Sequence, residues 1–243
     1  MDKPFVQFGT AHLIGVLATL IPGLLMIAWA KRSQSEKVDY WMRIIIAWII
    51  VFFFFAMRIS RMIDGTFSIQ EDLPLHLCGF SSILIPFMLF NKNFKLYETM
   101  YFWGVGGATQ SLLTPTVQDP FPSFYYWEFF FTHSFIIIGV LHATIMFKYR
   151  PTMKGLFRTY WITFAMLFPM GLVNWAIGAN YFFIAHKPET ASLLDIMGPW
   201  PFYLFPLSLV ALTIFLIIYT PFPIMDWVRR RSENKKILDP QNA

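Results

Sequence analysis

The chain has 243 residues, of which 56% are hydrophobic, 19% aromatic and only 14% charged. A soluble domain usually carries about 25% charged residues and could not bury this much apolar surface, so the composition excludes that class and predicts a polytopic membrane protein. The net charge of +5 does not require a nucleic-acid partner, because Lys and Arg residues commonly flank transmembrane helices on their cytoplasmic side.

Seven apolar stretches approach or exceed the roughly 20 residues that a helix needs to cross the hydrocarbon core. In chain order they are residues 8–30, 41–59, 73–90, 94–113, 125–147, 156–184 and 200–220. The first stretch lacks the flanks of a cleavable signal peptide, and Pro169 with Gly171 predicts a kink in the sixth. These stretches predict one all-α membrane domain over residues 1–243, with a short basic cytoplasmic tail at 221–243.

The basic residues divide unequally between the two ends of the predicted helices. One end holds 15 of the 19 Lys and Arg residues: Lys31, Arg32, Lys37, Arg43, Lys92, Lys95, Lys148, Arg150, Lys154, Arg158, Arg229, Arg230, Arg231, Lys235 and Lys236. The other end holds the remaining four, which are Lys3, Arg58, Arg61 and Lys187. Because positive residues concentrate on the cytoplasmic side, we expect seven transmembrane helices with the N-terminus outside and the C-terminus in the cytoplasm.

Polar side chains, which are energetically costly to bury in a membrane, gather in the outer half of this predicted bundle. In chain order they include Arg58, Arg61, His76, Cys78, Gln110, Glu128, His133, Asn174 and Asn180. Polar and ionisable groups at membrane depth usually face the bundle interior or a wet cavity. We therefore expect an outward-facing pocket, with Arg58, Arg61, Glu128, Gln110, Asn174 and Asn180 as candidate substrate-binding residues.

The stretch Leu-Pro-Leu-His-Leu-Cys at 73–78 carries a histidine and the chain's one cysteine. Residues two apart diverge by about 200° on a helix, so His76 and Cys78 cannot face one substrate unless Pro74 and Gly79 unwind the backbone. A free cysteine is often a small inert core residue, and His76 and His133 could equally be a hydrogen-bonded structural pair. Both catalytic and structural interpretations remain open from these residues alone.

The sequence gives no reason to expect a metal or a cofactor. His12, His76 and His133 could in principle converge on zinc, but nothing in their spacing brings them together. The sequence contains no nucleophile elbow, phosphate-binding loop or dinucleotide-binding glycine pattern. One cysteine also rules out an internal disulfide framework.

Several motifs together resemble the YwaF-like bacterial integral membrane proteins. They are Leu73-Pro-Leu-His-Leu-Cys78, Gly106-Gly107, Thr114-Pro115, Asn180-Tyr181, Lys187-Pro188 and Gly198-Pro199-Trp200-Pro201-Phe202-Tyr203. This group is similar to the eukaryotic transmembrane protein 164 family, which is associated with acyl transfer onto lyso-ether phospholipids through a cysteine acyl-enzyme and a histidine partner. The resemblance implies a multi-pass protein of the bacterial plasma membrane, with a membrane lipid as its partner.

The resemblance implies an acyltransferase or transacylase acting on phospholipid, with His76, His133 and Cys78 as catalytic candidates. In one version the Cys78 thiolate attacks an acyl ester with His133 or His76 as base, although a Pro-Cys-His order would align its cysteine with Leu75. In a second version Cys78 is inert and a histidine deprotonates a lipid hydroxyl directly. Arg58 and Arg61 would hold a lipid phosphate.

Two functions without acyl transfer are also compatible with the sequence. Gly104, Gly106, Gly107 and Pro86 would suit the mobile or broken helices of a membrane transporter. A protein that binds a small molecule or a lipid without chemistry would need the same polar pocket. The sequence does not identify a protein partner.

Overall fold

The computed structural model describes residues 5–117, 119, 121–187 and 196–238, which form helices and loops with no strand among them. The elements are α1 (Thr10–Ser33), α2 (Glu36–Ile63), α3 (Leu77–Asn91), α4 (Phe94–Met100), the π-helix η1 (Tyr101–Ala108), α5 (Thr109–Leu113), α6 (Phe124–Met146), α7 (Met153–Ile177), the 3-10 helix η2 (Tyr181–Phe183), α8 (Leu204–Tyr219) and α9 (Pro221–Leu238). The predicted all-α class is confirmed.

Five helical segments of the described chain are long and apolar enough to cross a membrane. They are α1, α2, α6, α7 and the rod formed by α8 and the first part of α9, and α3 is a shorter apolar helix. The elements α4, η1 and α5 follow one another from Phe94 to Leu113, which are the bounds expected for the fourth stretch. The membrane class predicted from composition is therefore confirmed.

Several segments differ from the expected boundaries; α2, for example, runs from Glu36 to Ile63 rather than over 41–59. α3 begins at Leu77 rather than at residue 73, because His76 has an extended backbone (φ −80°, ψ 159°) and Pro74 lies before the helix. α7 ends at Ile177 rather than near residue 184, because Gly178 takes a left-handed conformation (φ 68°) that terminates the helix. The expected tail after residue 220 begins as α9, and its residues 239–243 lie outside the described part of the chain.

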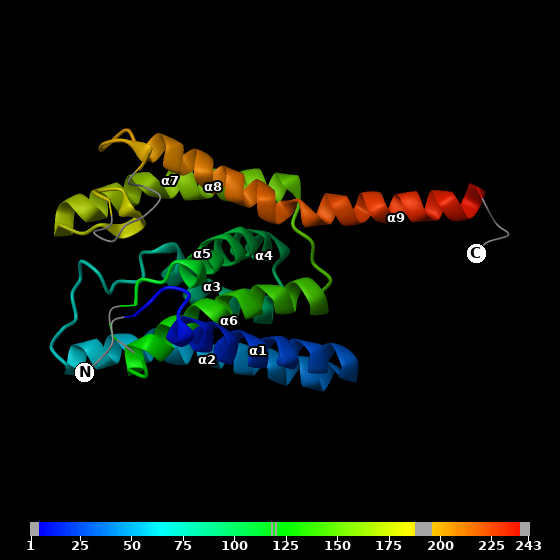
Figure 1. Cartoon of the computed structure of the whole chain (residues 1–243), viewed down its shortest axis with the longest axis horizontal. Helices are drawn as coiled ribbons and strands as arrows, with labels where there is room; N and C mark the ends of the chain where they lie inside the picture. Colours follow the sequence, from blue (N-terminus) through cyan, green and yellow to red (C-terminus); the bar gives the residue numbers. More distant parts are fainter. Residues whose placement is uncertain (1–4, 118, 120, 188–195, 239–243) are drawn as a thin grey trace.

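α6 is the central helix, and it packs against α1, α2, α3 and η1. In its apolar stretch 67% of the residues are buried within the protein, compared with 6% in the stretch that starts at α8. Figure 1 shows α1 and α2 on one side of α6, and α7 with α8 in an outlying layer on the opposite side. The glycines of α1 permit the close contact with α6, because a Cβ on Gly15 would lie 2.5 Å from the Phe130 ring.

The helices run roughly parallel to the long axis of the molecule and end at two opposite faces (Figure 1). We call the face where α1, α3 and α6 begin and α2 ends the mouth end. We call the opposite face, where α1, α3 and α6 end, the tail end. Most basic residues expected to be cytoplasmic lie toward the tail end, including Lys31 and Arg32 in the last turn of α1.

Candidate functional site

A cavity of about 330 Å³ lies between α2, α3 and α6 at the mouth end. Its lining comes from α2, the loop before α3, the first turns of α3, the loop before α6, and α6: Phe54, Met57, Arg58, Arg61, Glu71, Asp72, Leu73, Pro74, His76, Cys78, Gly79, Ser82, Thr116, Glu128, Phe129, Thr132 and His133. Six of the nine expected site residues line it, namely His76, Cys78, His133, Arg58, Arg61 and Glu128. His133 lies ten residues beyond the α6 N-cap Ser123, so the cavity descends about 15 Å along that helix.

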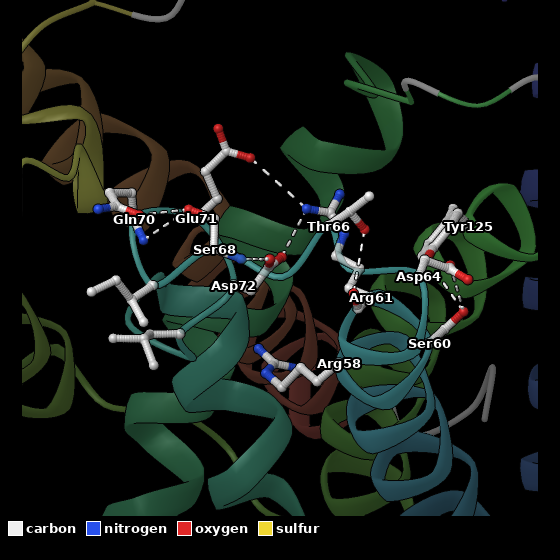
Figure 2. Close-up of polar contacts among 12 residues, drawn as sticks. Arg58, Ser60, Arg61, Asp64, Thr66, Ser68, Gln70, Glu71, Asp72 and Tyr125 are labelled. Carbon is white, nitrogen blue, oxygen red and sulfur yellow. Dashed lines mark hydrogen bonds and ion pairs between the residues drawn. The ribbon is translucent and has the colours of Figure 1, made fainter.

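The two arginines of α2 have different surroundings. Arg61 lies 2.9 Å from the buried carboxylate of Asp72 and 3.8 Å from Glu71, and Figure 2 shows both carboxylates joined to it by dashed lines. Arg58 lies one turn deeper, and its Nη1 donates to the Phe54 carbonyl at 2.6 Å. Within the described residues no carboxylate lies within ion-pair distance of Arg58, and its buried Nε has no hydrogen-bond partner. Arg58 therefore retains donors for an anion, whereas Arg61 is neutralised.

Glu128 faces Arg58 from the opposite wall of the cavity. Its carboxylate accepts a hydrogen bond from Thr132 Oγ1 at 3.0 Å, one helical turn further along α6. Arg58 and Glu128 both line the cavity without meeting in an ion pair. A guanidinium and a carboxyl group held apart in this way can bind an anion beside a hydrogen-bond donor.

The two histidines of the cavity present different nitrogens to it. His133 Nδ1 lies 2.8 Å from the Phe129 carbonyl, and because a carbonyl only accepts, Nδ1 carries the proton and Nε2 keeps a lone pair. His76 Nδ1 accepts from the Phe182 backbone N–H at 3.4 Å, so in the neutral ring Nε2 carries the proton. Burial lowers the pKa of His76 to about 4, so this ring is neutral at pH 7. Thus His133 can accept a proton where His76 can donate a hydrogen bond.

Cys78 lines the same cavity as His76 because the helix begins between them. The extended backbone at His76 removes the 200° divergence that a continuous helix would impose, and Gly79 lets the chain fold back closely, since a Cβ there would lie 2.8 Å from the Pro74 backbone. In the described chain no hydrogen bond joins the Cys78 thiol to either histidine. The local unwinding needed to bring both residues to one site is present, but a preformed thiol–imidazole pair is not.

Three of the expected site residues do not line the cavity. Gln110 lies exposed on α5 and bonds Thr114 Oγ1 at 3.1 Å. Asn174 is buried near the end of α7, where its side chain bonds both the N–H and the carbonyl of Tyr181. Asn180 folds the following loop, since its Oδ1 accepts from the backbone N–H groups of Ala185 and His186. The two asparagines therefore organise backbone at the mouth end.

Asp72 and Thr132 are polar lining residues outside the expected set. Asp72 is 3% exposed, and it takes the Ser68 N–H on Oδ2 and Arg61 on Oδ1 (Figure 2). Thr132 follows Glu128 by four residues, so helical spacing places both on one face of α6. That spacing could have identified Thr132, whereas only the folded loop reveals that Asp72 is buried.

A closely packed apolar layer lies between the cavity and the tail end of α2, α3 and α6. Ile46, Ile50 and Ile85 are completely buried there, and a Cβ on Gly139 of α6 would lie 2.6 Å from Ile85. Beyond this layer, Asp39 lies 3.1 Å from both Arg43 and the fully buried His142. The same three helices thus carry a cavity at one end and a buried polar cluster at the other.

The described residues contain no group of three or more His, Cys, Asp and Glu side chains arranged to hold a metal ion. His12, the third histidine considered from sequence, is outside the cavity lining. Its Nε2 lies 2.7 Å from the Leu112 carbonyl and its Nδ1 accepts from the Phe8 N–H. Both ring nitrogens therefore join α1 to neighbouring backbone.

A family model described as the TMEM164 family matches residues 7–219, which is most of the chain. The protein belongs to the TMEM164 family. This confirms the resemblance to the YwaF-like and transmembrane protein 164 groups, and the match includes every residue that lines the cavity. No curated protein and no solved structure matches the chain.

Proposed function

We propose that this TMEM164-family protein is an acyltransferase or transacylase that modifies a phospholipid in the cavity at the mouth end. The observation that carries the proposal is the combination, in one cavity, of a histidine lone pair, a histidine donor and a guanidinium without a carboxylate partner. Acyl transfer needs these three elements: a base for the incoming hydroxyl, a donor to the developing oxyanion, and a site for the lipid phosphate.

The leading mechanism uses His133 as the base. Its Nε2 takes the proton from a lysolipid hydroxyl while the oxygen attacks the ester carbonyl of an acyl donor. Nε2–H of His76 would stabilise the negative oxygen of the tetrahedral intermediate. When that intermediate collapses, the bond to the donor alcohol breaks, and protonated His133 returns its proton to the leaving oxygen.

A second mechanism adds Cys78 as a nucleophile. The thiol proton passes to His133, the sulfur attacks the acyl ester, and the leaving alcohol receives the proton, so that a thioester forms. The acceptor hydroxyl then attacks the thioester and restores the thiol. Because the thiol is not already paired with an imidazole, we rank this mechanism second.

The charged residues would position the lipid. Arg58 would bind its phosphate, since a guanidinium presents a planar set of donors to phosphate oxygens. Glu128 would accept a hydrogen bond from an ammonium or hydroxyl group of the same molecule. Arg61 would contribute by holding the loop over the cavity through Asp72, rather than by binding phosphate itself.

The test uses purified full-length protein in lipid nanodiscs with a phospholipid labelled in one acyl chain and a lysophospholipid acceptor. We expect labelled diacyl product from wild type, a large loss in His133→Gln and a partial loss in His76→Gln. Cys78→Ser keeps transfer under the leading mechanism and loses it, together with a hydroxylamine-labile label, under the second. His142→Gln is the matched control, because His142 lies on the same helix but outside the cavity.

Full transfer by a protein that lacks both cavity histidines would refute the proposed site. Equal loss in His133→Gln and His142→Gln would point to general damage of α6 instead. Thermal melting of each variant in the same nanodiscs separates these two outcomes.

We propose that the chain crosses the bacterial plasma membrane seven times, with the mouth end outside and the tail end in the cytoplasm. The five long helices would be joined by α3 and by the α4–η1–α5 rod, whose 20 residues from Phe94 to Leu113 span about 30 Å. Single cysteines in a Cys78→Ser background test this: Thr66→Cys should react with an impermeant maleimide on intact cells, and Gln34→Cys should not. The reverse pattern would overturn the orientation.

Transport is the second candidate, and η1 is the observation that favours it. An eight-residue π-helix is rare and often marks a functional site, and a Cβ on its Gly107 would meet nothing within 4 Å. The apolar layer beneath the cavity argues against a continuous path. Accumulation of an unmodified solute in proteoliposomes, abolished by Gly104→Leu, would favour transport over chemistry.

A further inference from the structure

The loop that lines the mouth of the cavity is attached to the end of α7 and to η2, with a tyrosine at the centre of the contacts. This loop, residues 64–76, joins α2 to α3 and includes Asp72 and His76. Tyr181 of η2 is fully buried beside it, and its hydroxyl donates to the Ile69 carbonyl at 2.8 Å and accepts from the Leu73 N–H at 3.0 Å. A single phenol oxygen therefore bonds two backbone groups of the loop, which are more than 100 residues away from Tyr181 in the sequence.

Tyr181 is itself held firmly from α7. The Asn174 side chain accepts from the Tyr181 N–H at 2.8 Å and donates to its carbonyl at 2.9 Å. Gln70 adds a third link, since its Nε2 donates to the Ile177 carbonyl at 3.1 Å. The loop thus rests on the end of α7 through contacts that satisfy buried backbone groups, which are costly to leave unpaired.

The same segment fixes the orientation of His76. The His76 ring packs edge-on against Tyr181, with ring centroids 5.1 Å apart, and lies 5.4 Å from the Phe183 ring. Phe182 has a left-handed backbone (φ 61°), unusual for a non-glycine residue, and its N–H is the donor to His76 Nδ1. This hydrogen bond leaves the Nε2 proton of the neutral ring available to the cavity.

We infer that Tyr181 is a positioning residue, which with Asn174 couples the α7–α8 layer to the mouth of the cavity and sets the tautomer of His76. The inference rests on the proposed function only for the consequence of that placement for acyl transfer. Loss of the Tyr181 hydroxyl would free the loop at Ile69 and Leu73 and loosen the segment that carries the Phe182 N–H. His76 would then sample both tautomers and lose its fixed donor.

The experiment compares Tyr181→Phe with Tyr97→Phe in the full-length protein in nanodiscs. Tyr97 is an equally buried tyrosine of α4 whose hydroxyl contacts Thr144 Oγ1 and the Tyr149 carbonyl, away from the cavity. Hydrogen–deuterium exchange of the peptide containing Leu73 reports on the loop, and the ¹⁵N signals of labelled His76, assigned with His76→Gln, report on its tautomer. Asn174→Asp, which removes the donor to the Tyr181 carbonyl, is a second variant in case Tyr181→Phe does not fold.

We expect exchange at Leu73 to become roughly fivefold faster in Tyr181→Phe, as for the loss of one hydrogen bond, and the His76 signals to shift toward a tautomer mixture. Tyr97→Phe should change neither. Unchanged exchange and unchanged His76 signals in both Tyr181→Phe and Asn174→Asp would overturn the inference, whether or not the protein transfers acyl chains. Changed signals with undiminished transfer in Tyr181→Phe, while His76→Gln lowers transfer, would also overturn the positioning role.

Discussion

The two polar regions of α2, α3 and α6 differ in how fully their charges are matched. At the tail end, Asp39 lies between Arg43 and His142, Arg43 also bonds the Leu89 carbonyl, and the three side chains are largely buried. At the mouth end, Arg58 and Glu128 face a cavity without pairing, and His133 retains a free lone pair. The first arrangement holds helices together, whereas the second leaves charge and hydrogen-bonding capacity for a ligand.

The largest expected difference is between two histidines of α6. His133→Ala should lower acyl transfer by about 10²–10⁴-fold, the usual contribution of a general base, while the protein remains folded. His142→Ala should leave transfer near wild type and lower the melting temperature, because Asp39 and Arg43 lose a buried partner. Rates and melting curves of both variants check the comparison, and equal loss of rate would contradict it.

The second prediction concerns the acidic residues of the two regions. Asp39→Ala leaves the buried Arg43 without its counter-charge, so we expect the free energy of unfolding to fall by about 3 kcal/mol. Glu128→Ala loses only the hydrogen bond from Thr132, and should cost about 1 kcal/mol. Denaturant unfolding in mixed micelles measures both, and a greater cost at Glu128 would reverse the assignment.

The third prediction tests the apolar layer that separates the two regions. Gly139→Ala should destabilise the protein by about 1–3 kcal/mol, because the added Cβ would lie 2.6 Å from Ile85. Gly107→Ala is the matched control, since a Cβ there meets no atom within 4 Å and the substitution should be close to neutral. Equal stability of both variants would show that the layer is not tightly packed.

The smallest expected effect compares two glutamates with amide replacements. Glu128→Gln keeps an acceptor for Thr132 and should change the free energy of unfolding by less than about 1 kcal/mol. Glu98→Gln should cost more, because the buried Glu98 carboxylate accepts from Thr152 and from Arg158 at 2.9 Å. A larger cost at Glu128 would mean that this carboxylate has a structural role.

The sequence predicted which polar residues lie at one end of the bundle better than it predicted their contacts. The rule that polar groups at membrane depth face a cavity grouped His76, Cys78, His133, Arg58, Arg61 and Glu128, and these six residues line one cavity because each lies near the same end of an apolar helix. It also included Gln110, Asn174 and Asn180, which lie at that end but outside the cavity lining. Helix periodicity gives the depth of a residue but not the partners that other helices bring to it.

Hydropathy along the sequence also misplaced one end of each of two helices, α3 and α7. Apolar residues already begin at Leu73, before α3, and continue past Gly178, so hydropathy alone extends the third and sixth stretches too far. The backbone at His76 and Gly178 ends this continuity, and in the first case it brings His76 and Cys78 to one cavity.

By itself the sequence determined that this is an all-helical membrane protein, that it resembles the TMEM164 family, and that its polar residues gather toward one end of the bundle. Composition and the period of apolar residues are sufficient for the helical membrane class and for the polar end, because they report on single helices, whereas the resemblance rests on short motifs. Only the tertiary structure decided that Arg61 is neutralised while Arg58 is not, which nitrogen each histidine presents, and that Asn174 holds Tyr181. These properties depend on contacts between residues distant in sequence, such as Tyr181 with Ile69, and no local pattern encodes them.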